Sequence, residues 1–108
     1  MGYQEDLDKA NKAIQRNPKD ADAYRDRGGL YGAMGDSQQS ISDFSMAITL
    51  APSYGAYYGR GFEYGKAGDF EQAIEDFNMA LELEPSDPAG ARLSLNEAHK
   101  GNRSHFGG

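Results

Sequence analysis

A block of 33 residues occurs twice in tandem in this chain of 108 residues. Residues 21–53 and 54–86 are identical at 17 of the 33 aligned positions. Identity of this density at a fixed spacing is typical of a repeat array, in which each unit packs mainly on its neighbours. The length also limits the chain to one domain of ordinary size. The repeat therefore restricts the fold to a short array of similar units.

Each block has the pattern of two helices joined by a tight turn. Apolar residues recur at three- and four-residue steps in the second half of each block, which indicates one face of a helix. Gly35 and Gly68 stand where a left-handed residue ends the first helix, and Asp36 and Asp69 follow as N-caps of the second. The sequence therefore predicts an antiparallel helix pair in each block.

The residues that the blocks share resemble the tetratricopeptide repeat, whose pattern is Trp-x2-Leu-Gly-x2-Tyr, then Ala-x3-Phe, then Pro. The matching residues are Tyr24 and Tyr57 at the Trp place, Gly28 and Gly61, Tyr31 and Tyr64, Ser40 and Ala73, Phe44 and Phe77, and Pro52 and Pro85. The resemblance implies an all-α fold, a right-handed superhelical solenoid of antiparallel helix pairs with about six helices.

The same resemblance divides the chain. Residues 1–20 are expected to form a half repeat, the second helix of a unit, because residues 3–17 align with the second helix of the next unit. Full units follow at 21–53 and 54–86, and then a capping helix at 87–100, with Asp87 as its N-cap and Pro88 as its first residue. Residues 101–108 are predicted to be a disordered tail.

Two arginines stand where the family usually has leucine. Arg27 and Arg60 are each followed sixteen residues later by an aspartate, Asp43 and Asp76, on the second helix of the same unit. A buried arginine without a partner would be costly. We therefore predict structural ion pairs, Arg27–Asp43 and Arg60–Asp76; the alternative is a pair of anion-binding arginines.

Tetratricopeptide domains hold peptides in a concave groove lined by the first helix of each unit, and the resemblance implies such a groove here. Its predicted lining is Asp22, Arg25, Asp26, Gly29, Ala33, Tyr58, Gly59, Phe62, Lys66 and Arg92. We call these ten residues the predicted groove. Tyr58 and Phe62 are four apart on one helix face and suit an apolar anchor of a peptide; the alternative is that they pack on the capping helix.

Four glycines within the first helices, Gly29, Gly32, Gly59 and Gly65, have no role in a turn. Each costs about 1 kcal/mol relative to alanine in a helix interior. They are assigned to the groove face. There they either bring bare backbone close to a ligand or are tolerated drift in a robust array.

The net charge of −6 argues against nucleic acid and anionic membranes as partners. The chain has no cysteine, and its two histidines, His99 and His105, lack both metal-ligand spacing and a neighbouring nucleophile. No apolar run approaches the ~20 residues that cross a bilayer. We therefore expect no catalytic residue, no metal and no cofactor, and place the chain in the cytoplasm by default.

The function predicted from the sequence is protein–protein interaction, with a basic or neutral peptide carrying an apolar anchor as the partner. The cluster of Lys, Asn and Arg with which some tetratricopeptide domains clamp chaperone C-termini is mostly missing, because its places carry Arg25, Gly29 and Gly59, with Arg92 only roughly aligned. The alternative is a self-assembling scaffold, a homo-oligomer formed through the first helix. An excised or designed array without a natural ligand is a further alternative.

Overall fold

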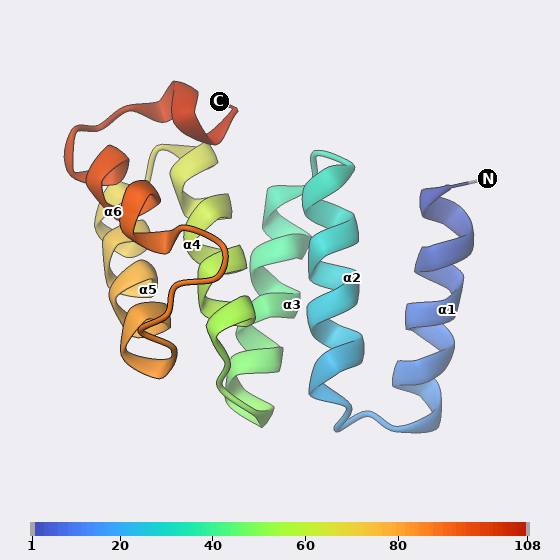
Figure 1. Cartoon of the computed structure of the whole chain (residues 1–108). Coiled ribbons are helices and arrows are strands. Elements are labelled where there is room, and N and C mark those ends of the chain that lie inside the picture. The colour runs from blue at the N-terminus through green and yellow to red at the C-terminus, as the bar shows by residue number, and fades with distance from the viewer. Residues whose placement is uncertain (1, 108) are drawn as a thin grey trace.

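Six α-helices stand side by side in a single row in the computed structural model, which describes residues 2–107 (Figure 1). They are α1 (Tyr3–Arg16), α2 (Ala21–Ala33), α3 (Ser37–Leu50), α4 (Tyr54–Ala67), α5 (Phe70–Leu83) and α6 (Ala91–His99). A 3₁₀ turn, η1 (Arg103–Phe106), follows them. Each helix packs on the next, so that α2 pairs with α3 and α4 pairs with α5. The prediction of an all-α array with six helices is confirmed.

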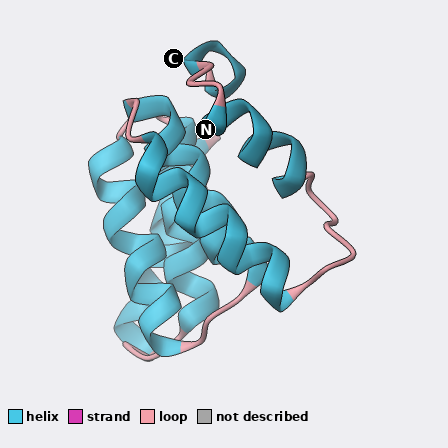
Figure 2. Cartoon of the chain, turned by 90° about the vertical axis from the view of Figure 1, so that its left-hand side faces the viewer, coloured by secondary structure: helices cyan, strands magenta, loops and turns pink. Residues whose placement is uncertain are grey.

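Helices and their connecting loops account for all of the described chain in Figure 2, which looks at the array from the end where α5 and α6 lie. The array measures 41 × 27 × 20 Å. No helix within residues 2–107 is both long enough and apolar enough to cross a membrane.

The turn between the two helices of each unit is built as the sequence predicts. Gly35 and Gly68 have positive φ angles of 86° and 81°. The carboxylates of Asp36 and Asp69 accept hydrogen bonds from the third backbone N–H of α3 and α5. Left-handed glycine ends one helix and aspartate begins the next, which keeps the turn short and the helices antiparallel.

Glycine allows the paired helices to approach. A Cβ atom on Gly28 would lie 3.2 Å from the ring of Phe44, and one on Gly61 would lie 2.9 Å from the ring of Phe77. The aromatic side chain of the second helix therefore rests on the bare backbone of the first in both units. Phe44 and Phe77 are 6% and 0% exposed, and they form the centre of each unit's core.

The capping helix begins later than predicted. It starts at Ala91 rather than at Pro88, because residues 88 and 89 form a turn and Gly90 precedes the helix with a φ of 84°. Asp87 still acts as its cap, since its carboxylate accepts hydrogen bonds from the backbone N–H of Ala91 (2.6 Å) and Arg92 (3.1 Å). Its own φ of 57° turns the chain so that the cap reaches four residues forward.

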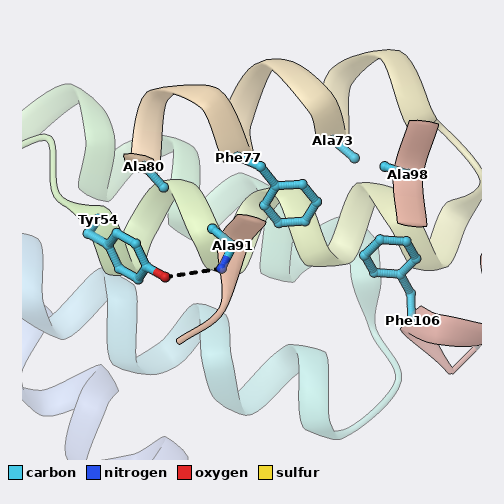
Figure 3. Close-up of a cluster of buried hydrophobic side chains, with 7 residues drawn as sticks. All are labelled: Tyr54, Ala73, Phe77, Ala80, Ala91, Ala98 and Phe106. Carbon is cyan, nitrogen blue, oxygen red and sulfur yellow. Dashed lines mark hydrogen bonds between the residues drawn. The ribbon is translucent and has the colours of Figure 1, made fainter. Parts of the chain in front are cut away.

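The prediction of a disordered tail over residues 101–108 is wrong for the part that the structure describes. Residues 103–106 form η1, and Phe106 is 1% exposed. Figure 3 shows its ring in the same cluster as Phe77 and Ala98, with Tyr54 and Ala91 at the other end. The tail folds back because one large aromatic side chain gains more by burial than its short, polar neighbours lose by ordering. Residue 108 lies outside the described residues.

Candidate functional site

Both predicted ion pairs are present. Arg27 donates from Nε and Nη2 to the two carboxylate oxygens of Asp43, each at 2.8 Å, and Arg60 makes the same bidentate contact with Asp76 at 2.9 and 2.8 Å. The aspartates are 7% and 3% exposed. The carboxylate hydrogen bond raises the pKa of each arginine above its usual value, so both pairs stay ionised.

The remaining donor of each arginine reaches back to the preceding unit. Nη1 of Arg27 donates to Asn11 Oδ1 at 3.1 Å, and Nη1 of Arg60 donates to Ser45 Oγ at 3.0 Å. Every nitrogen of these guanidinium groups thus has a partner within the protein. The arginines join three helices, and the alternative of an anion-binding pair is not supported.

The α2 part of the predicted groove lies on the surface, as expected. Asp22, Asp26, Gly29 and Ala33 are exposed, and nothing lies within 4 Å of the place that a Cβ on Gly29 would occupy. Arg25 is 40% exposed and pairs with Asp22 at 3.3 Å. On α6, Arg92 is exposed. These six side chains are accessible to a partner.

The two aromatic side chains of α4 are packed within the protein. The ring of Phe62 meets the ring of Phe106 edge-on at 5.0 Å, and that of Tyr58 lies 5.8 Å from Phe77 and parallel to Tyr54 at 5.9 Å. Both remain half-buried. The structure therefore favours the alternative reading, internal packing, although Phe62 packs on the C-terminal turn as well as on the capping end.

Gly59 was wrongly assigned to the predicted groove. A Cβ atom there would lie 2.5 Å from the ring of Phe44, so this residue faces α3 of the preceding unit. Gly65 likewise faces the ring of Phe106 at 2.6 Å, and Gly32 faces the carboxylate of Glu63 at 2.6 Å. All three glycines make room for a side chain from another helix or turn. Only Gly29 leaves backbone open to a ligand.

Glu63 is a buried carboxylate that the sequence analysis did not identify. It is 6% exposed, accepts a hydrogen bond from Ser37 Oγ at 2.9 Å, and pairs with Lys66 at 3.0 Å. Lys66 also donates to the carbonyl oxygen of Gly32 at 3.2 Å. The amino group of Lys66 therefore joins the two units, and only its half-exposed edge faces the predicted groove. The signal for Glu63 was a charged residue at the place where the first unit has Leu30.

A groove of about 530 Å³ lies between α1 and α2. Its lining is Asp6, Lys9, Ala10 and Ala13 from α1, Asp20 from the connecting loop, and Asp22, Ala23, Asp26 and Leu30 from α2. We call it the end groove. Two residues of the predicted groove, Asp22 and Asp26, thus lie at its edge rather than on a face shared with α4.

Within residues 2–107, no three His, Cys, Asp or Glu side chains are placed to hold a metal ion. His105 lies 3.0 Å from the hydroxyl of Ser94, and this contact ties the C-terminal turn to α6. The clearest carboxylate shift is structural as well, because the hydrogen bond from the Tyr54 hydroxyl to Asp87, at 2.7 Å, lowers the pKa of Asp87. The site offers surfaces for binding rather than groups arranged for catalysis.

The sequence model of the tetratricopeptide repeat family matches residues 55–87, the second unit with a shift of one residue. The first unit shares 17 of 33 residues with it. The first tetratricopeptide domain of Spaghetti (RPAP3), solved bound to the HSP90 peptide SRMEEVD, superposes with a TM-score of 0.86 over 91% of this chain and 78% of that chain, at 26% identity. The chain is a tetratricopeptide repeat domain.

Other solved tetratricopeptide structures are similar. The first such domain of human RPAP3, solved by NMR, has a TM-score of 0.86 and 25% identity over 94% of this chain and 80% of that chain. The tetratricopeptide domain of Arabidopsis OM64 has a TM-score of 0.86 at 24% identity over 91% and 81%, which supports the fold alone. A comparison with curated protein sequences gave no match. In tetratricopeptide terms, α1 is the second helix of a unit, α2–α3 and α4–α5 are full units, and α6 with η1 closes the array.

Proposed function

We propose that this tetratricopeptide domain is a protein–protein interaction module that holds a peptide or partner segment across α2, α4 and α6. The observation that carries the proposal is the open backbone strip on α2. Gly29 has free space beyond its Cα, and Ala33, one turn along, is exposed. A helix face this bare loses stability unless it is used, and it lets a ligand chain approach the backbone closely.

The similar RPAP3 domain bound to the HSP90 peptide SRMEEVD supports peptide binding as the general mode. An acidic tail is nevertheless a poor match for this chain. Arg25 is already paired with Asp22, and Gly59 is turned toward α3. Together with the net charge of −6, this favours a basic or neutral partner segment.

The apolar anchor of such a segment would reach Tyr58 and Phe62 only at their exposed edges, since the rest of each ring is packed internally. The polar contacts fall to Arg25, Lys66 and Arg92, which border the strip. We propose that binding uses the strip on α2 first, and that the α4 aromatic edges add apolar contact.

Selection from a random peptide library displayed on phage tests this proposal, followed by titration of a selected peptide by fluorescence anisotropy. Gly29→Gln fills the strip without touching another side chain. Ser42→Gln, on the exposed side of α3, is the matched control. We expect Gly29→Gln to weaken binding at least about tenfold and Ser42→Gln to leave it unchanged. Equal binding by Gly29→Gln and the unaltered chain would contradict the proposal.

A further inference from the structure

We propose that the end groove between α1 and α2 is the seat of a helix from a basic protein partner. This docking site is separate from the strip on α2. The proposal comes from the repeat itself, because the same seat occurs further along the array and is filled there.

The filled seat shows what the end groove is built to hold. The four residues of α3 that bury themselves against α2 are Ser40, Asp43, Phe44 and Ala47. At the offset of 34 residues that aligns α1 with α3, the corresponding residues are Asp6, Lys9, Ala10 and Ala13, which are the four from α1 that line the end groove. The end groove therefore lies where a first helix of the unit would pack on α1.

The α2 wall of the end groove tells the same story. Its residues Ala23, Asp26 and Leu30 correspond, at the repeat of 33, to Ala56, Gly59 and Glu63 of α4. Ala56 and Glu63 are 0% and 6% exposed, because α4 packs on the preceding unit. A helix placed in the end groove would cover α2 as the preceding unit covers α4.

The floor of the end groove selects a different helix from those in this chain. In the filled seats, Phe44 and Phe77 rest on glycines of the first helix. Here Ala10 takes the place of phenylalanine, so the space for a ring is left within the groove. An occupant with a large apolar side chain over Ala10 fills that space, whereas a glycine there would leave a void that weakens packing.

The charges select against a second copy of this chain. Lys9 stands where Asp43 pairs with Arg27, so the arginine of α2 or α4 would meet a lysine in this seat. Four aspartates, Asp6, Asp20, Asp22 and Asp26, also line the groove against that single lysine, with Arg25 paired to Asp22 at its outer edge.

The carboxylate of Asp6 adds a requirement of its own. It takes the place of Ser40, whose hydroxyl donates to the carbonyl oxygen of Gly28 at 2.7 Å. A carboxylate has no hydrogen to donate, so the occupant must present donors of its own. The complementary occupant is an amphipathic helix with one large apolar anchor flanked by lysine or arginine.

A helical peptide of 14 residues, the length of α4, provides the probe. It consists of leucine, alanine and lysine, with leucine at every third or fourth position, and a second peptide carries glutamate in place of lysine. Fluorescence anisotropy measures binding of each labelled peptide to the full chain. We expect the lysine peptide to bind, to weaken as salt rises from about 0.05 to about 0.5 M, and the glutamate peptide not to bind.

Variants locate the site. Ala10→Phe fills the floor as Phe44 does in the next unit, and Asp26→Lys reverses one wall charge. Each is expected to weaken the lysine peptide at least about tenfold. Glu75→Lys on the exposed side of α5 makes the same charge change elsewhere, and Gly29→Gln blocks the strip on α2; both are expected to change binding less than about twofold. Asp6→Lys repeats the test on α1 without altering its packing if Ala10→Phe unfolds.

Equal binding of the lysine peptide to the unaltered chain and to both Ala10→Phe and Asp26→Lys would overturn the proposal. Glutamate-peptide binding of the same strength would overturn it as well. Sedimentation equilibrium provides the third test, because a dimer that Ala10→Phe abolishes would assign the seat to a second copy instead. Loss of the strip's ligand by Gly29→Gln leaves all of these outcomes unchanged, so the two sites are tested separately.

Discussion

Replacing Phe106 with alanine tests how the C-terminal turn contributes to the array. The side chain is 1% exposed, and its ring stacks on Phe77 at 6.0 Å and meets Phe62 edge-on at 5.0 Å. Burying a phenylalanine fully is worth about 1.5–3 kcal/mol, and deleting one from a core costs about 3–5 kcal/mol when a cavity remains. Because η1 lies near the end of the chain and relaxes easily, we expect about 3 kcal/mol.

A loss of that size is a large part of a net stability of ~5–15 kcal/mol. The assay is urea unfolding followed by far-ultraviolet circular dichroism. The midpoint temperature is expected to fall by more than about 10 °C, since each kcal/mol shifts it by ~4–8 °C in a domain of this size. Ser104→Ala, exposed in the same turn, is the control and is expected to change stability by less than about 0.5 kcal/mol.

A Phe106→Ala variant within about 0.5 kcal/mol of the unaltered chain would refute this reasoning. It would mean that residues 103–106 do not pack on α4 and α6 in solution. The open faces of those helices would then be available to a ligand, and the aromatic pair of α4 would regain its predicted role.

Three further outcomes follow from the same contacts. Gly29→Ala is expected to raise the free energy of unfolding by about 0.5–1 kcal/mol, whereas Gly59→Ala lowers it because the new methyl group meets the phenylalanine ring of α3; parallel urea titrations compare the two. Asp76→Asn is expected to cost about 3 kcal/mol by leaving Arg60 buried without its anion, and a smaller loss than an exposed Asp→Asn control would contradict the ion-pair account. The depressed pKa of Asp87 stabilises the fold above the ordinary aspartate pKa of 3.8, and this stability is lost as pH falls through the lowered value; Asp87→Asn should flatten the acid limb of a stability–pH profile, and an unchanged limb would refute the role of this carboxylate.

The repeat made the helices and ion pairs predictable. Identical residues 33 positions apart must occupy equivalent places, so a charge such as Arg27 and its partner Asp43 recur together as Arg60 and Asp76. The turns were predictable for the same reason, because glycine followed by aspartate has a local meaning that no distant contact overrides.

The errors arose where contacts come from outside the local pattern. The orientation of Gly59 depends on a ring in the preceding unit, which helical periodicity within α4 does not show. The burial of Phe106 depends on α4 and α5, thirty or more residues away, whereas its own neighbours are glycine and polar residues typical of a disordered tail. The start of α6 moved because Asp87 adopts a positive φ and caps over a longer reach than usual.

The candidate binding surface was partly predictable. The α2 residues are exposed where the resemblance implies, but Lys66 is held by Glu63, a residue whose burial follows from the packing between the two units. The end groove went unnoticed because it depends on Ala10 replacing phenylalanine in a helix that was recognised only by its spacing. Small residues give a weak sequence signal, even where they leave a large space.

Backbone amide chemical shifts, measured while a library-selected peptide is added to the isotope-labelled chain, test the central claim most directly. If the domain binds its partner across the strip on α2, the largest shift changes will fall on residues 25–33 and on the start of α6, with the exposed sides of α3 and α5 unaffected. Changes concentrated instead on α3 and α5 would contradict the account, because recognition would then use the opposite face of the array.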